Sequence, residues 1–232
     1  MIDAVIFDCD GTLLDSMPAW HALEADLAWM AGIELTPSQS DMLNANTLIQ
    51  TVAYFHNIYG VGRSLPRLLE EARGILLESY RTLVKPRIGA VELVRQLHSD
   101  GIKLAVASSS PQALVRTGLE RAGIYELFSC VASAEDEGAS KREAHFAASV
   151  GDRLGAARAN TWCIDDSAYA LCAMKQAGFH TIGIYDSDIA GTLSQLATCS
   201  DHALRSFSEL DYDAFVAGRY QRDFMHTQYA TA

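Results

Sequence analysis

Short apolar runs of three to five residues recur along the chain, separated by stretches with helical periodicity. These runs lack the apolar–polar alternation of a half-exposed strand, so they are typical of strands buried on both faces. They are residues 4–7, 103–107, 129–131, 161–164 and 181–184. Strands that alternate with helices predict an α/β fold, a doubly wound parallel sheet of Rossmann-like type. In such sheets, ligands bind beyond the carboxyl ends of the strands.

One long stretch interrupts this alternation. Between about residues 15 and 88 the pattern is helical throughout and contains no convincing strand. A single crossover seldom needs so many residues, although the helices could also simply cover the sheet. We therefore predict a core domain made of residues 1–15 and 88–232, and a small helical cap domain made of residues 16–87. Within the cap, we expect Trp29 and Phe55 to pack between helices.

Composition excludes several classes of partner and site. The chain has 232 residues and a formal charge of −11, which argues against binding to nucleic acid or to anionic membranes. Its five cysteines are an odd number without CxxC spacing, which argues against a disulfide framework and a zinc site. No apolar run approaches about 20 residues. We expect a cytoplasmic protein, a monomer or weak homodimer.

Acidic residues follow two of the predicted strands. Asp8 and Asp10 end the first strand and precede Gly11, which permits a sharp turn of the backbone. Asp165 and Asp166 end the fourth strand in the same way. Either pair alone is common as a turn or a helix cap, but two pairs at one sheet edge are not. Hard carboxylate oxygens select Mg²⁺ over zinc.

Candidate anion ligands follow the second and third predicted strands. Ser108 and Ser109 close the second strand before a helix, and helix N-termini bind phosphate, although serines there also make ordinary caps. Lys141 follows the third strand and is positioned to neutralise a phosphoryl group. A lone lysine is more often solvated, and Arg142 is its rival for this role.

The order of these motifs resembles the four-motif signature of the haloacid dehalogenase (HAD) superfamily. The matching elements are Asp8-x-Asp10-Gly11-Thr12, then Ser108, then Lys141, then Asp165-Asp166. The match is best to the capped, β-phosphoglucomutase-like branch and covers roughly residues 1–210. It implies a sheet of order 5-4-1-2-3 with a helical lid over the active site.

The resemblance also implies a role for each motif. Asp8 would be the nucleophile that forms an aspartyl-phosphate, and Asp10 the general acid and then the base. Ser108 and the N–H of Ser109 would bind the phosphoryl oxygens, and Lys141 would steady both Asp8 and the phosphate.

The metal would be Mg²⁺, and its expected ligands come from both acidic pairs. They are Asp8, the backbone carbonyl of Asp10, Asp166 and Asp165.

These roles predict a phosphatase acting on a sugar phosphate or similar metabolite. Candidate substrate contacts in the cap are Trp20, Asn44, Asn46 and Thr47. A phosphomutase is the alternative. Related mutases, however, carry a histidine where Trp20 stands and a basic residue in the cap, whereas residues 43–47 contain no lysine or arginine. An inorganic pyrophosphatase remains open. A non-catalytic regulatory protein is disfavoured because no catalytic position is lost.

Overall fold

The computed structural model describes residues 2–187 and 190–220, and its core is a six-stranded parallel sheet. The strands follow the order β5-β4-β1-β6-β7-β8 across the sheet. Their bounds are β1 (Ala4–Phe7), β4 (Lys103–Ser108), β5 (Cys130–Ser133), β6 (Thr161–Asp165), β7 (His180–Ile184) and β8 (His202–Leu204). This confirms the predicted α/β fold class. The predicted order 5-4-1-2-3 is the same order read from the other edge, and β8 adds a sixth strand beyond β7.

Helices cover both faces of the sheet because its strands are apolar on both sides. On β1, Val5 and Phe7 belong to one buried cluster, whereas Ala4 and Ile6 belong to another. The first cluster contains side chains of α5 (Ala90–Ser99) and α6 (Gln112–Arg121), and the second those of α8 (Ala144–Leu154) and α9 (Ala168–Gln176). The remaining core helices are α7 (Ala134–Glu137), α10 (Leu193–Cys199), α11 (Tyr212–Val216) and the 3₁₀ turns Tyr125–Leu127, Arg158–Asn160 and Phe207–Glu209.

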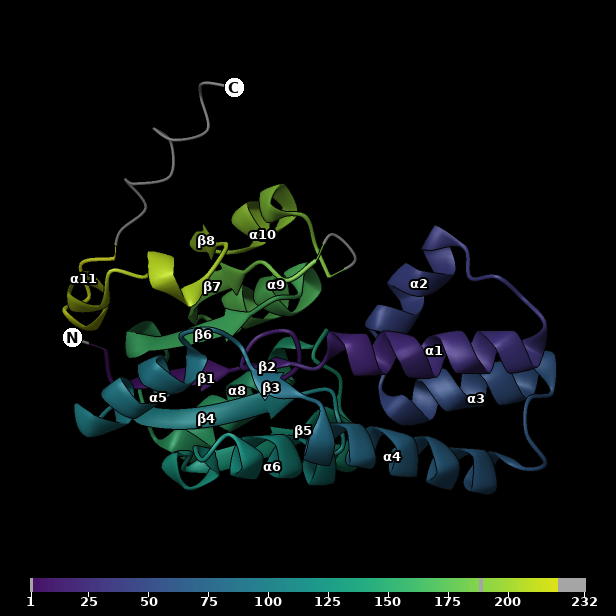
Figure 1. The fold of residues 1–232 in the computed structure, drawn as a ribbon. Helices are drawn as coiled ribbons and strands as arrows, with labels where there is room; N and C mark the ends of the chain where they lie inside the picture. Colours follow the sequence, from purple (N-terminus) through teal and green to yellow (C-terminus); the bar gives the residue numbers. More distant parts are fainter. Residues whose placement is uncertain (1, 188–189, 221–232) are drawn as a thin grey trace.

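Four helices form the insertion between β1 and β4. They are α1 (Met17–Ala31), α2 (Pro37–Asn44), α3 (Leu48–Tyr59) and α4 (Leu65–Thr82). Figure 1 shows them gathered at one end of the molecule, beyond the helices that flank the sheet. The insertion leaves and rejoins the core through two short antiparallel strands, β2 (Leu14–Asp15) and β3 (Lys85–Pro86). We propose that this pair marks the boundaries of the cap.

The prediction that residues 15–88 contain no strand is wrong at β3. A two-residue strand is too short to produce a periodic pattern, and only its partner β2, 70 residues earlier in the chain, defines it. The packing expected for Trp29 is also wrong, because its side chain is 82% exposed on α1. Phe55 is fully buried in the cap, as predicted.

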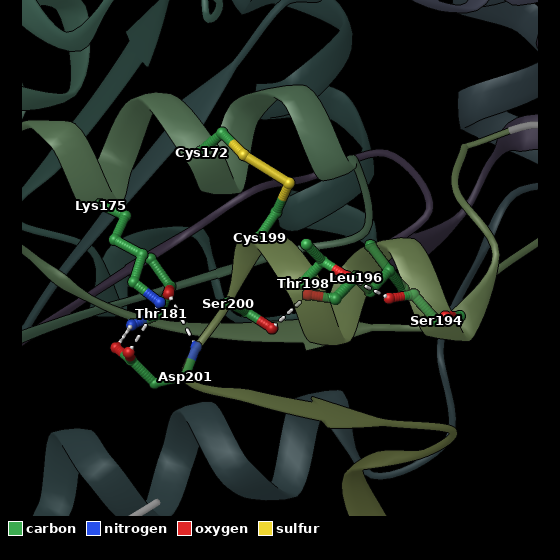
Figure 2. Close-up of a disulfide and its surroundings, with 9 residues drawn as sticks. All are labelled: Cys172, Lys175, Thr181, Ser194, Leu196, Thr198, Cys199, Ser200 and Asp201. Atoms are coloured by element: carbon green, nitrogen blue, oxygen red, sulfur yellow. Dashed lines mark hydrogen bonds and ion pairs between the residues drawn. A yellow bond between two sulfur atoms is a disulfide. The ribbon is translucent and has the colours of Figure 1, made fainter.

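A disulfide joins α9 to α10. Cys172 on α9 bonds to Cys199 at the end of α10, with their Cα atoms 4.9 Å apart (Figure 2). Close to it, Lys175 forms an ion pair with Asp201 at 3.0 Å. The odd number of cysteines without CxxC spacing predicted no disulfide framework, and this prediction is wrong for Cys172 and Cys199. The two cysteines are 27 residues apart in sequence, and only the packing of α9 against α10 brings them together.

Across the described ranges 2–187 and 190–220, no helix combines the length and apolar character needed to cross a membrane.

Candidate active site

The two central strands bring the acidic pairs together. β1 and β6 are parallel neighbours in which Phe7 lies opposite Ile164, and the backbone N–H of Asp8 donates to the carbonyl of Ile164 (2.8 Å). Both strands therefore end at the same level. Asp8, Asp165 and Asp166 are all buried, and they offer carboxylate oxygens that lie within 4.8 Å of one another.

Lys141 is buried against this cluster. Its Nζ lies 2.7 Å from Oδ1 of Asp8 and 2.5 Å from Oδ2 of Asp165. Burial lowers the pKa of the ammonium, but the charges of Asp165 and Asp8 outweigh that effect and raise the pKa well above its usual value. Lys141 is therefore held as a cation between two strand ends.

One ammonium does not balance three buried carboxylates. Burial, opposed by Lys141 and reinforced by neighbouring acids, raises the pKa of Asp8 to about 7. Burial and the charge of Asp8 likewise raise the pKa of Asp166 well above its ordinary value. A divalent cation with a preference for oxygen ligands would supply the missing positive charge.

The backbone next to the cluster leaves room for such an ion. Gly11 has a left-handed φ of 82°, and a Cβ at this position would lie 2.5 Å from Oδ2 of Asp166. Thr12 donates a hydrogen bond to the other oxygen of Asp166 (3.3 Å). A glycine is therefore required here both for its conformation and for its small size. The donor set and the space fit a divalent metal site.

Asp10 is held by four hydroxyl groups. Its Oδ1 accepts hydrogen bonds from Ser16 (2.6 Å) and from the phenol of Tyr80. Its Oδ2 accepts from Ser110 (2.6 Å) and Ser108 (3.3 Å). Three of these partners were not predicted from the sequence. Ser110 follows Ser108 by two positions and Ser16 follows Asp10 by six, but nothing in the sequence links Tyr80, on α4, to this site.

The cap thus contacts the core through a short hydrogen-bonded chain. The indole N–H of Trp20, on α1, donates to the phenol oxygen of Tyr80 (2.9 Å), which in turn donates to Asp10. All three groups lie at the junction of cap and core. Trp20 was predicted to contact substrate, and it lines the pocket while its indole N–H is already used within the protein.

A pocket lies between the cap and the carboxyl ends of the strands. It brings together most of the residues selected from the sequence, including Ser109, Asn44 and Asn46. Asp165 and Thr47 are not part of the lining: Asp165 pairs with Lys141, and Thr47 caps α3 by accepting from the N–H of Gln50 (3.4 Å). The lining consists of Asp8, Asp10, Met17, Trp20, Glu24, Leu43, Asn44, Asn46, Ser108, Ser109, Ser110, Lys141, Asp166, Ser167 and Tyr169.

Comparison with known proteins identifies the family of this chain. Residues 5–184 match the family described as Haloacid dehalogenase-like hydrolase. The chain belongs to this family. Membership confirms the resemblance inferred from the motifs, and it identifies the chain as an enzyme with the acidic site of a phosphatase.

The chain is similar in sequence to several phosphatases. It is 27% identical over 184 residues to Hexitol phosphatase B of Escherichia coli K12, covering 77% of this chain and 82% of that protein. It is 26% identical over 216 residues to the putative phosphatase YhcW of Bacillus subtilis, covering 91% and 94%. It is also 25% identical over 186 residues to the putative pyrophosphatase PpaX of Clostridium perfringens, covering 79% and 84%.

Solved structures share the fold. β-Phosphoglucomutase from Clostridium difficile superposes with a TM-score of 0.77 at 19% identity, covering 95% of this HAD chain and 97% of the other. CbbY from Rhodobacter sphaeroides, in complex with phosphate, superposes with a TM-score of 0.74 at 21% identity, covering 91% of this chain and 97% of the other. At sequence identities of 19% and 21%, this likeness shows a shared fold, a core sheet with an inserted cap.

Proposed function

We propose that this enzyme is a Mg²⁺-dependent phosphatase that hydrolyses a small phosphate monoester, such as a sugar phosphate, through an aspartyl-phosphate on Asp8. One observation carries the proposal. A single pocket at the ends of adjacent strands is lined by the carboxylates of Asp8 and Asp166, the ammonium of Lys141 and the carboxyl group of Asp10. The names of the phosphatase relatives support the same class of reaction.

In the first step, a carboxylate oxygen of Asp8 attacks the phosphorus of the substrate. The bond between phosphorus and the ester oxygen breaks, and Asp10 gives its proton to that oxygen, so that the alcohol leaves neutral. The hydroxyls of Ser16 and Ser110, each 2.6 Å from Asp10, hold its carboxyl in place for this transfer. Asp8 now carries the phosphoryl group.

In the second step, Asp10 accepts a proton from a water molecule, whose oxygen attacks the phosphorus. The bond from phosphorus to Asp8 breaks, which releases inorganic phosphate and restores the carboxylate. Throughout, Lys141 offsets the charge of Asp8 and of the phosphoryl oxygens, and Ser108 and Ser109 bind those oxygens. Phosphoryl transfer depends mainly on such alignment and charge stabilisation.

Mg²⁺ fits the acidic cluster, and its ligands would be Asp8, the backbone carbonyl of Asp10, Asp166 and Asp165. When bound, the ion polarises the phosphoryl group and reduces the repulsion between the phosphate and the carboxylates.

A phosphomutase needs to hold a second phosphate group of its substrate while the substrate changes its orientation in the site. Among the residues that line the described pocket, Lys141 is the sole cation, and it is already paired with Asp8 and Asp165. The charge of the pocket therefore favours hydrolysis over phosphoryl transfer between two positions of a sugar.

Hydrolysis of p-nitrophenyl phosphate with and without Mg²⁺ tests the proposal. We expect turnover that requires the metal and that Asp8→Asn abolishes, while circular dichroism of the variant is unchanged. A panel of phosphorylated metabolites that includes pyrophosphate then identifies the substrate. Absence of turnover at every divalent metal concentration would exclude a phosphatase, and full activity of the variant would exclude Asp8 as nucleophile.

A further inference from the structure

Glu24 is a buried acidic residue of the cap that the reaction steps above do not use. It lies on α1 and lines the pocket together with Met17 and Trp20, at the spacing of one helix face. Only 7% of its surface is exposed. Within residues 2–187 and 190–220, no group donates a hydrogen bond to its carboxyl or forms an ion pair with it.

A carboxyl in this environment destabilises the folded protein. Burial raises the pKa of Glu24 to about 7, with no compensating cation or donor. Leucine or glutamine would fill the same space on α1 without this cost, because neither buries an ionisable group. An ionisable side chain that is buried, without a partner and directed at a pocket is typical of a ligand contact.

The surroundings of Glu24 define which ligand group suits it. Besides α1, the cap contributes to the pocket lining from α2 and the loop after it, with the apolar Leu43 and the neutral amides of Asn44 and Asn46. Lys141, the sole cation of the described lining, belongs to the core and is already paired with Asp8 (2.7 Å) and Asp165 (2.5 Å). A second anionic group on the substrate would therefore face the carboxylate of Glu24 on the cap side of the pocket, and the cap residues of the described lining include no cation to offset that charge.

We propose that Glu24 is a specificity-determining residue that accepts hydrogen bonds from substrate hydroxyls and rejects a second phosphate. The substrate class is then a polyhydroxylated monophosphate with an uncharged tail. This inference rests on the proposed phosphatase function and narrows it. A hydroxyl group donates to the carboxylate and gives it the partner that it lacks in the protein. A phosphate in the same place is repelled, which separates the two substrates by differential binding.

The test compares fructose 6-phosphate with fructose 1,6-bisphosphate, which differ by one phosphate, at pH 8 with Mg²⁺. We expect kcat/KM of the wild-type enzyme to be at least about tenfold higher for the monophosphate. Glu24→Gln removes the charge and keeps a hydrogen-bonding group of equal size, so the preference should fall to about threefold or less, mainly through faster hydrolysis of the bisphosphate. Glu24→Lys should reduce the preference further.

Asp26→Asn is the matched control, because Asp26 is an exposed carboxylate on the same helix. This control should keep the wild-type preference. If the enzyme is active and Glu24→Gln keeps the wild-type preference for the monophosphate, the inference is overturned and the proposed function still holds. An enzyme that hydrolyses neither sugar phosphate nor p-nitrophenyl phosphate would overturn both.

Discussion

The phenol of Tyr80 donates a hydrogen bond to Oδ1 of Asp10, although the two residues are 70 positions apart in sequence. Tyr80 lies in the last turns of α4, close to the point where the cap rejoins the core, and it is fully buried. Gly118 of α6 makes room for Leu14 and for this ring, since a Cβ there would clash with the Leu14 side chain and lie 3.1 Å from the tyrosine ring. The position of the cap and the orientation of the Asp10 carboxyl are therefore linked through one side chain.

Tyr80→Phe removes this hydrogen bond and keeps the ring. We expect kcat to fall about tenfold, with KM changed by less than about twofold, because Asp10 loses one of the donors that orient it. Tyr212→Phe is the control, since it removes a phenol–carboxylate hydrogen bond to Asp100 (2.6 Å) outside the pocket lining. Steady-state kinetics check this, and equal kcat in wild type and Tyr80→Phe would show that Asp10 does not depend on the cap.

Lys141→Met leaves buried carboxylates without their counter-charge. We expect the free energy of unfolding at pH 8, without metal, to fall by about 3–5 kcal/mol. Lys175→Met breaks an ion pair with Asp201 (3.0 Å) in which the lysine side chain is 35% exposed, and should cost about 1 kcal/mol or less. Denaturant unfolding measures both, and equal losses would mean that the Lys141 pair contributes no more than a surface pair.

Mg²⁺ should stabilise the folded enzyme independently of any substrate. At a hundredfold excess of the ion over its Kd, we expect about 2–3 kcal/mol of added stability, seen as a rise in Tm. Asp166→Asn should remove most of that rise, whereas Asp41→Asn, at an exposed carboxylate of the cap, should keep it. A Tm response to Mg²⁺ that is the same in both variants would place the ion elsewhere.

Glu24→Gln should change how stability depends on pH. Burial raises the pKa of Glu24 in the folded protein to about 7, above its usual 4.5, so the folded state binds the proton more tightly than the unfolded state. The contribution of Glu24 to stability is therefore present at low pH and is lost as pH rises from about 4.5 to 7.

The glutamine variant lacks this loss. At pH 8 it should be more stable than wild type by about 2–3 kcal/mol, and near pH 4.5 the two should differ little. Urea unfolding at the two pH values measures the difference. A variant that is less stable than wild type at pH 8 would mean that the carboxylate has a stabilising partner.

Reduction should weaken the packing of α10 on α9. The disulfide between Cys172 and Cys199 closes a loop over a separation of 27 residues, so its loss should cost about 3 kcal/mol. Dithiothreitol should lower the Tm of the wild-type enzyme and leave that of Cys172→Ser unchanged. A wild-type Tm that does not respond to dithiothreitol would mean that this bond does not form in solution.

Much of the fold could be predicted because its signals are local. The strand at residues 4–7 is apolar at every position, so its burial on both faces and the helices around it follow from the run itself. The two-residue strand β3 and the exposure of Trp29 could not be predicted in this way. The first depends on pairing with a distant segment, and the second on which face of α1 the other cap helices cover.

The sequence by itself determined which acidic residues come together and at which end of the strands they lie. Asp8 and Asp166 each follow a buried strand, and parallel strands end together, so their approach follows from local pattern and topology. Only the tertiary structure decided what surrounds them. Tyr80 reaches Asp10, and Glu24 is buried facing the pocket, because of how the cap helices pack on one another and on the core. Such contacts depend on the relative placement of separate elements, and local patterns in the chain do not encode that placement.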